Sequence, residues 1–243
     1  MKLLSIAVAV ASLGAAAEVD EFFAEFEAKR DHIERLHARF SQETTTPDEE
    51  TRAVGFIVYE KPRRILLQYL DPEVTYLIDE SRVYQYDPEL EQVQIYDLDD
   101  DPQLEALFLG FDSETDRLRE AYGVELFEPD PSTCGDQALR LTPLPQSAGE
   151  AGEDVAPLFE QIALYLRTDD YLPCRIHVIN DEDSEVEISV AEFKVNDAAG
   201  DAAAQLVLPE GTQIIENEVL VETVGPGGAT LPRADAAAEE PAR

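Results

Sequence analysis

The sequence predicts a mainly β protein whose strands form an antiparallel sheet. Between Ala53 and Asp97, short runs rich in Val, Ile, Leu and Tyr alternate with turn signals such as Lys61-Pro62 and Asp71-Pro72. Apolar, β-branched and aromatic runs bounded by Pro and Asp are typical of strands and turns. Parallel neighbours would need crossovers of a dozen or more residues, and these connections are shorter. The stretch is therefore predicted to be an antiparallel meander.

Several of these strands carry apolar residues at consecutive positions, as in Phe56 to Tyr59, Ile65 to Leu67 and Tyr76 to Ile78. A sheet with one solvated face alternates strictly between apolar and polar side chains. Both faces of this sheet are therefore predicted to avoid water. Two interpretations stay open: a packed sandwich or helix-covered core, or a face that lines a cavity for an apolar ligand.

Helices are predicted on either side of the meander. Apolar residues from Val19 to Gln42 recur at three- and four-residue steps, which predicts one helix over 19–42. Asp101 and Pro102 fit the N-cap and first position of a second, short helix. Its apolar stripe is formed by Leu104, Leu107, Phe108 and Phe111. Short apolar helices inserted between strands suit a lid over a sheet.

Further strands are predicted in the second half of the chain, over 124–127, 137–142, 158–167, 174–180, 186–195 and 205–208. From Thr223 onward small and charged residues dominate, so 223–243 is predicted to be a disordered tail. Residues 18–222 are then one domain.

The charge is strongly acidic: 18 Lys and Arg stand against 53 Asp and Glu, a formal net charge of −35. Phosphates must be met by positive charge, so nucleic acid is excluded as an expected partner. Acidic, Lys-poor surfaces suit proteins that stay soluble in high salt, where self-repulsion is screened. A salt-rich source is one hypothesis for this composition, and a charged partner is the other.

The first 17 residues are predicted to be a cleavable secretory signal peptide. Lys2 is followed by the apolar run Leu3 to Leu13 and by the small-residue pattern Ala15-Ala16-Ala17. No Cys stands at the expected cleavage point, so we expect a soluble, unlipidated product in an exported compartment. In an oxidising compartment the two cysteines, Cys134 and Cys174, are a candidate disulfide, with two free thiols as the alternative.

Catalytic and metal-binding patterns are weak. The sequence has no G-x-S-x-G nucleophile motif and no Gly-rich phosphate loop. His32 and His37 are five residues apart, which does not place two metal ligands on one helix face. The acidic run from Asp181 to Glu185 lacks the spacing of an EF-hand. We therefore expect a protein that is not an enzyme and that uses no metal or cofactor.

Four segments together resemble the periplasmic lipoprotein carrier family LolA. Gly55 to Pro88 contains G-F-I-V-Y-E-K-P, then L-Q-Y-x2-P-E and I-D-E-S-R-V-Y-Q-Y-D-P. The later motifs are L-x-L-T-P from Leu139, F-x-x-I-x-L from Phe159 and L-P-E-G-T-Q-I-I from Leu208. Order, spacing and turn residues agree from about Phe22 to Ile215.

The resemblance implies an unclosed antiparallel β-barrel of about 10–11 strands, with an α-helical lid over a hydrophobic cavity. It implies a soluble, monomeric periplasmic carrier that binds the acyl chains of lipoproteins. The expected partners are an inner-membrane ABC-type lipoprotein releasing complex and, where present, an outer-membrane lipoprotein receptor. A lipid or glycolipid shuttle, or a lipid-sensing module of the same fold, is the alternative function.

Site residues follow from the resemblance and from the strand pattern. The cavity wall is assigned to Phe56, Val58, Ile65, Leu67, Tyr69, Tyr76 and Ile78. The lid is assigned to Phe22, Phe26, Leu104, Leu107, Phe108 and Phe111. In the family an Arg commonly precedes the Pro of the turn after Glu60 and helps to latch the lid. This chain has Lys61 there, followed by Arg63 and Arg64, as latch candidates.

Overall fold

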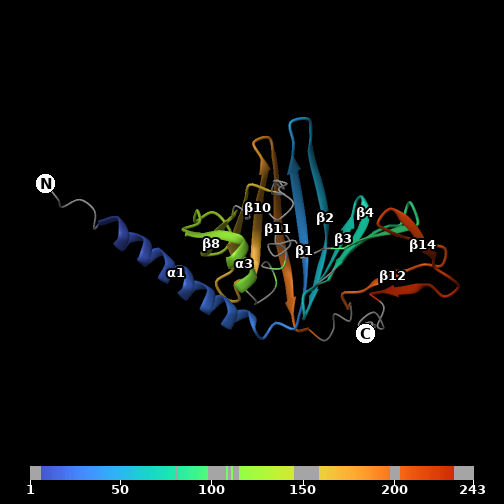
Figure 1. Cartoon of the computed structure of the whole chain (residues 1–243), viewed down its shortest axis with the longest axis horizontal. Helices are drawn as coiled ribbons and strands as arrows, with labels where there is room; N and C mark the ends of the chain where they lie inside the picture. Colours follow the sequence, from blue (N-terminus) through green and yellow to red (C-terminus); the bar gives the residue numbers. More distant parts are fainter. Residues whose placement is uncertain are drawn as a thin grey trace, which may run out of the picture. The chain divides into compact units, whose positions relative to one another are not determined.

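The computed structural model describes residues 7–79, 82–97, 108, 111, 115–144, 159–197 and 203–232, with the side chains of 7–16 and 117 excepted (Figure 1). The protein is mainly β, as predicted, and its large sheet is unclosed. Thirteen strands follow the order β14-β13-β6-β5-β4-β3-β2-β1-β11-β10-β9-β8-β7, and β12 and β15 form a second, two-stranded sheet. The larger sheet has more strands than the predicted 10–11.

The chain divides into two compact units, each built from separate stretches of sequence. Unit 1 comprises 1–32, 43–51 and 102–189, and unit 2 comprises 33–42, 52–101 and 190–243. Unit 1 contains the helices α1 (Ala7–Arg30) and α3 (Asp116–Ala121). Its strands are β7 (Tyr122–Phe127), β8 (Gln137–Pro143), β9 (Gln161–Leu166) and β10 (Pro173–Asp181), together with the first half of β11 (Ser184–Val195).

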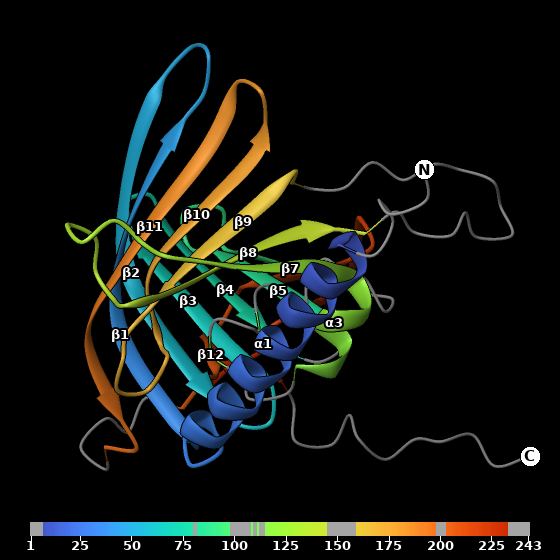
Figure 2. The same cartoon turned by 90° about the vertical axis from the view of Figure 1, so that its left-hand side faces the viewer.

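Unit 1 is an antiparallel meander covered by α1. Figure 2 shows α1 beside α3 and across β7 and β8. The side chains of Phe22, Phe23 and Phe26 are at most 6% exposed and belong to one apolar cluster with residues of β8 and β9, among them Leu139 and Leu164. An amphipathic helix that buries a full aromatic stripe in this way gains most of its stability from packing.

Unit 2 contains the predicted meander, with β13 and β14 from the C-terminal part of the chain added beside β6. Its consecutive antiparallel strands are β1 (Arg35–Thr45), β2 (Glu50–Glu60), β3 (Arg64–Leu70), β4 (Glu73–Ile78), β5 (Arg82–Asp87) and β6 (Gln92–Asp97). β13 (Gln213–Glu216) pairs with β6 in parallel and with β14 (Val219–Thr223) in antiparallel orientation. The sheet is therefore not wholly antiparallel.

The prediction of one helix over 19–42 was wrong. α1 ends at Arg30, and residues 35–45 form β1. Leu36 and Phe40 share a face in a helix and also in a strand, because four residues is both one helical turn and two strand repeats. Ala38 decides between them: it is fully buried with Leu36 and Phe40, whereas Arg39 is exposed. Buried and less buried residues alternate from Arg35 to Phe40, as in a strand.

The disordered tail predicted over 223–243 begins too early. β15 (Ala229–Leu231) pairs with β12 (Leu206–Leu208), and Val224 and Leu231 are buried. Gly227 and Gly228 adopt left-handed backbone angles, φ 96° and 77°, that favour glycine and reverse the chain before β15. The Gly-rich composition that suggests disorder is here the composition of a turn. Residues 233–243 lie outside the described part of the chain.

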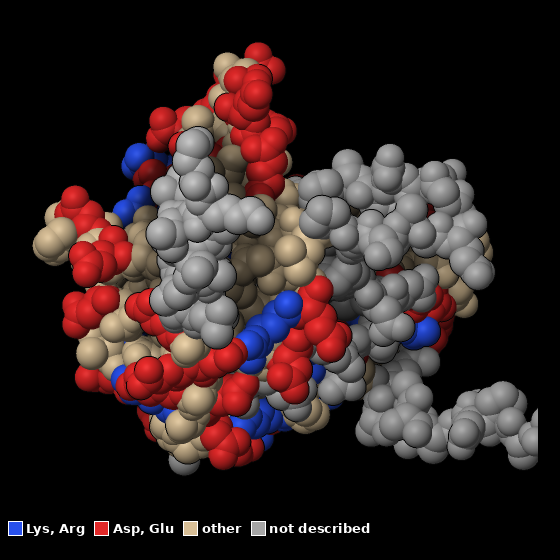
Figure 3. Space-filling view, turned by 60° about the vertical axis from the view of Figure 1, so that its left-hand side comes forward, with Lys and Arg blue, Asp and Glu red and all other residues tan. Residues whose placement is uncertain are grey.

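The surface is as acidic as the composition predicts. Figure 3 shows Asp and Glu spread widely over the face in view, with fewer Lys and Arg among them. Cross-strand ion pairs use some of these cations, such as Arg140 with Glu125 at 2.6 Å and Arg35 with Glu60 at 2.8 Å. Within the described ranges, no helix is both long and apolar enough to cross a bilayer.

Candidate functional site

The strand register divides the predicted cavity wall between the two faces of the unit 2 sheet. Directly paired residues lie on the same face of an antiparallel sheet. Leu67 pairs with Ile57 on one side and with Tyr76 on the other, which places these three together. Val58 pairs with Leu66 and therefore lies on the opposite face. We call the first face the Tyr69 face and the second the Val58 face.

The Tyr69 face carries five of the seven predicted wall residues. They are Ile65, Leu67, Tyr69, Tyr76 and Ile78, and their neighbours on this face include Ile57 and Tyr59. Ile65 and Ile78 are 1% and 4% exposed, whereas Leu67, Tyr69 and Tyr76 are only half-buried. One part of the face is therefore a closed core, and the other keeps apolar and aromatic surface accessible.

A row of aromatic rings crosses the half-buried part of the Tyr69 face. Phe40 meets Tyr69 edge-on at 4.9 Å between ring centroids, and Tyr69 meets Tyr76 at 5.9 Å. The Tyr69 hydroxyl donates a hydrogen bond to Gln42 Oε1 at 2.9 Å. The Phe40 ring lies against Gly55, where a Cβ would stand 2.6 Å from it. The absence of a side chain at residue 55 leaves the space that this ring occupies.

Burial changes the acidity of these phenols. It raises the pKa of Tyr69 to about 12, with a smaller contribution from Tyr76. Burial also raises the pKa of Tyr76, helped by Tyr96 and Asp87. Burial removes water that would solvate the charged phenolate, and this raises the pKa of the phenol. Both side chains are therefore neutral hydrogen-bonding groups at physiological pH.

Phe56 and Val58 do not share the Tyr69 face, which corrects their assignment to the same wall. Val58 belongs to the unit 2 core cluster, which joins the Val58 face of β2–β6 to Leu206, Leu208 and Leu231 of the small sheet. Phe56 stacks on His37 at 5.6 Å, and burial lowers the pKa of that histidine, with Lys194 adding to the effect. Consecutive apolar residues of β2 therefore lie on opposite faces of the sheet. The Val58 face is covered by residues of the small sheet.

The structure gives only part of the predicted lid. Phe22 and Phe26 lie in the core of unit 1, where Phe22 stacks on Tyr171 at 5.5 Å between ring centroids. Phe108 is helical and 3% exposed, and Phe111 is 6% exposed. Leu104 and Leu107 lie outside the described residues. A lid role for these side chains stays a prediction.

The three latch candidates follow one another in the β2–β3 turn and at the start of β3. Lys61 is half-buried, and Arg63 is 7% exposed with a left-handed backbone angle, φ 49°. Arg64 pairs with Glu60 in the register and so lies on the Val58 face, near Tyr84, whose pKa it lowers against the larger effect of burial. Their role as a latch also stays a prediction.

Arg30 was missed by the sequence analysis. It is the last residue of α1, is 1% exposed, and donates to the backbone oxygen of Tyr171 through Nη2. Its guanidinium carbon lies 4.1 Å from the centroid of the Phe26 ring. A cation over an aromatic face is stabilising, and more so when both are desolvated. Arg30 thereby fixes the end of α1 to the β9–β10 connection, and only its place at a helix end could have suggested this.

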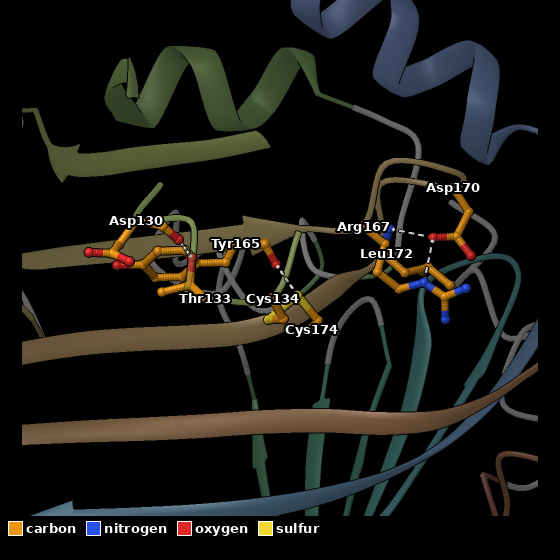
Figure 4. Close-up of a disulfide and its surroundings, with 8 residues drawn as sticks. All are labelled: Asp130, Thr133, Cys134, Tyr165, Arg167, Asp170, Leu172 and Cys174. Atoms are coloured by element: carbon orange, nitrogen blue, oxygen red, sulfur yellow. Dashed lines mark hydrogen bonds and ion pairs between the residues drawn. A yellow bond between two sulfur atoms is a disulfide. The ribbon is translucent and has the colours of Figure 1, made fainter. Parts of the chain in front are cut away.

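Cys134 and Cys174 are joined by a disulfide in unit 1 (Figure 4), with an S–S distance of 2.17 Å and Cα atoms 6.1 Å apart. The bond ties the loop before β8 to the start of β10. Cys174 Sγ also lies 3.4 Å from the backbone oxygen of Tyr165 on β9. Both cysteines are therefore cross-linked within one unit rather than available as thiols.

Metal chemistry has no visible basis in the described part of the chain. No group of three or more His, Cys, Asp or Glu side chains is arranged there to hold a metal ion. What the described residues do offer is a face that is partly apolar and partly aromatic, with Leu67, Tyr69 and Tyr76 only half-buried. Such a face suits non-covalent binding of hydrocarbon.

Comparison with known proteins gives a family match. The family model described as "Outer membrane lipoprotein carrier protein LolA" matches residues 31–203, more than half of the chain. A search of curated proteins found no match.

Solved structures that match over much of the chain do so at low sequence identity and with low TM-scores. An uncharacterised conserved protein from Thermus thermophilus is 14% identical with a TM-score of 0.48, covering 82% of this chain and 99% of that one. A LolA superfamily protein from Nitrosomonas europaea is 12% identical with a TM-score of 0.37, covering 72% and 93%. The MucA/MucB complex of Pseudomonas aeruginosa gives 12% identity and a TM-score of 0.39, covering 78% and 67%. Family membership rests on the family model and not on these scores.

Proposed function

This chain belongs to the family of the outer membrane lipoprotein carrier protein LolA, and from that membership we propose that it is a periplasmic carrier of lipoproteins. It binds their acyl chains and moves them from the inner to the outer membrane. Residues 1–17 act as the export signal. An inner-membrane ABC-type releasing complex supplies the cargo, and an outer-membrane receptor takes it where one is present. The chain carries and releases its cargo and catalyses no reaction.

The observation that supports this proposal is the half-buried part of the Tyr69 face. Leu67, Tyr69 and Tyr76 keep apolar and aromatic surface accessible on a strongly acidic protein. Each acyl CH₂ left in water costs ~0.8 kcal/mol, so three chains of about 16 carbons cost about 35–40 kcal/mol unshielded. A carrier needs such a surface, and this face provides one within a single unit.

The predicted lid and latch fit into this proposal as movable parts. Phe108 and Phe111 act as lid residues and Lys61, Arg63 and Arg64 as latch residues, the roles that the family resemblance implies for them. An unclosed sheet suits the task because a small closed barrel is filled by its own side chains.

A matched pair of variants tests the proposal. Leu67→Glu places a carboxylate on the Tyr69 face, and Val54→Glu places one on the Val58 face of neighbouring β2, where Val54 is 43% exposed. Both positions accept a polar side chain without filling a closed core. We expect Leu67→Glu to abolish binding of a fluorescent acyl probe and of a triacylated lipopeptide, because burying a carboxylate against hydrocarbon is costly. Val54→Glu should bind both like the wild type.

Equal binding by the two variants would place the lipid elsewhere and remove the support for the proposal. Circular dichroism and thermal melting of both variants show whether either change affects folding. Transfer of a triacylated lipopeptide from inner-membrane vesicles to the protein then distinguishes a carrier from a protein that only holds lipid.

A further inference from the structure

The Tyr69 face changes its chemistry from strand to strand. One row of directly paired residues runs across it from β2 to β6: Ile57, Leu67, Tyr76, Gln85 and Gln94. The row passes from aliphatic side chains through a phenol to two carboxamides. The neighbouring row runs in the same direction through Tyr59, Ile65, Ile78, Val83 and Tyr96.

The exposure of the side chains in these two rows increases from β2 and β3 toward β6. Ile57 is 3% exposed and Ile65 1%, whereas Gln85 and Gln94 are half-buried and Tyr96 is 41% exposed. The Tyr96 hydroxyl donates a hydrogen bond to Gln94 Oε1, which leaves the amide nitrogen of Gln94 as the end of that side chain that can donate. The accessible end of these two rows over β5 and β6 is thus made of neutral hydrogen-bonding groups.

None of the ten described residues in these two rows is charged. Lys, Arg, Asp and Glu make up 29% of the chain, so about three charged residues would be expected among ten. The opposite face of the same strands carries charges, for example Arg82, which pairs with Asp97 at 3.1 Å. Uncharged side chains are therefore a property of these two rows and not of the strands as a whole.

We propose that the Tyr69 face binds lipids whose head group is uncharged and rich in hydroxyl or amide groups. The hydrocarbon lies over β2–β4, and the head group lies over β5 and β6 against Gln85 and Gln94, with Tyr76 of β4 at the boundary between them. This inference rests on the proposed function, because it assigns the polar end of the same cargo. Glycosyl or glyceryl head groups and the amide-rich end of an acylated peptide share this chemistry.

Charge argues against an anionic head group at this position. A phosphate needs positive charge or strong donors around it, and the two rows contain no Lys or Arg. The net charge of −35 adds repulsion from the rest of the chain. Strand spacing supports a separate head region, because three steps of about 4.8 Å place Gln94 about 14 Å from Leu67. A head group over β6 thus leaves β2–β4 to the acyl chain.

The test measures displacement of a bound fluorescent fatty-acyl probe by lipids with identical acyl chains. Monogalactosyl diacylglycerol carries a neutral head, phosphatidylglycerol an anionic head that also has hydroxyls, and a diacylated neutral peptide amide represents the second source of the same chemistry. We expect at least one of the neutral lipids to displace the probe at about tenfold lower concentration than phosphatidylglycerol. The neutral lipid that displaces the probe at the lower concentration shows whether the preferred head group is a glycosyl group or a peptide amide.

Variants locate the effect. Gln85→Leu combined with Gln94→Leu should lose about tenfold in affinity for the better neutral lipid, as expected for two lost hydrogen bonds, and keep its affinity for the acyl probe. Gln68→Leu is the matched control, because Gln68 is exposed on the Val58 face of β3. Equal displacement by neutral and anionic lipids, or an equal loss in the Gln68→Leu variant, would overturn this inference and leave the carrier proposal standing. Failure of the wild type to bind any acyl probe would overturn both.

Discussion

Gly55 shows how a single residue shapes the candidate site. A Cβ at this position would stand 2.1 Å from the backbone oxygen of Gln68 and 2.6 Å from the Phe40 ring. The backbone oxygen belongs to the paired strand and cannot rotate away. Phe40 in turn holds Tyr69 in place, so the close approach of two strands at a glycine sets the position of the aromatic row.

We expect Gly55→Ala to destabilise the protein by about 1–3 kcal/mol, because the added methyl group forces the β2–β3 pair apart. Chemical denaturation measures the change. Gly123→Ala is the control, since a Cβ there meets nothing closer than 3.7 Å and should alter stability by less than about 0.5 kcal/mol. Similar losses in both variants would mean that the space around Gly55 is not the cause.

Tyr69 gives the protein a specific sensitivity to alkaline pH. Its pKa of about 12 lies above the ordinary value of 10.0, so between these values the unfolded chain loses a proton that the folded state keeps. The contribution to stability is complete below pH 10 and is lost as pH rises toward 12. We expect Tyr69→Phe to reduce the fall of unfolding free energy over this window by up to about 1.4 kcal/mol per pH unit.

The measurement is a series of denaturant unfolding curves from pH 9 to pH 12. Some slope should persist in the variant, because burial and the hydrogen bond to Glu25 also raise the pKa of Tyr171 to about 12. An unchanged slope in Tyr69→Phe would show that this phenol ionises as easily in the folded state as in the unfolded chain.

Single residues also mark how far the sequence could predict the site. Strand alternation alone identifies Leu67 and Tyr69 as neighbours on one face. It cannot say that Tyr76 shares this face or that Val58 faces the other way, because both depend on which residues pair between neighbouring strands. Arg30 was beyond prediction for another reason: its partners, Phe26 and the Tyr171 backbone, come together only when α1 packs on unit 1.

At the scale of elements, strong local signals were predictable and short or ambiguous ones were not. Strands β2–β6 carry dense β-branched and aromatic runs between clear turns, and all were predicted. β1 was mistaken for helix because its apolar spacing fits both periods. β15 has only three residues, Ala229 to Leu231, and gains its stability from burial with β12 rather than from its own composition. Tertiary packing decided both cases.

The β12–β15 pair yields a prediction about truncation. A chain that ends after Pro232 keeps Leu231, whereas a chain that ends after Val224 loses β15 and exposes Leu206 and Leu208, which are at most 3% exposed in the full chain. We expect the first truncation to leave stability unchanged and the second to cost about 2–5 kcal/mol, comparable to a large core deletion. Thermal unfolding of the two truncated chains distinguishes them, and equal stability would refute a structural role for β15.

At the scale of the whole molecule, the dominant property is charge. A formal net charge of −35 over 243 residues makes the folded state repel itself. Ion pairs such as Arg39 with Glu192, at 3.2 Å and largely exposed, contribute little each and are screened by salt. The net electrostatic contribution to stability, repulsion among acidic groups minus attraction within ion pairs, therefore depends on the ionic strength of the medium.

We expect the free energy of unfolding to rise as NaCl increases toward about 1 M, because screening weakens the net repulsion more than it weakens the few surface ion pairs. Urea unfolding at several salt concentrations measures the trend, and a series in sorbitol controls for general solvent effects. Greatest stability in salt-free buffer would contradict the proposed adaptation to high salt and favour a charged partner as the reason for the composition.

The parallel pairing of β13 with β6 sets a condition on how the protein is made. Val93 and Ile214 lie side by side, although more than a hundred residues separate them along the chain, and unit 2 as a whole is assembled from three stretches of sequence. A ribosome must therefore release almost the entire polypeptide before this unit can close. Until then β6 has no parallel neighbour, so unit 2 completes its sheet only late in synthesis, when nearly the whole chain is present.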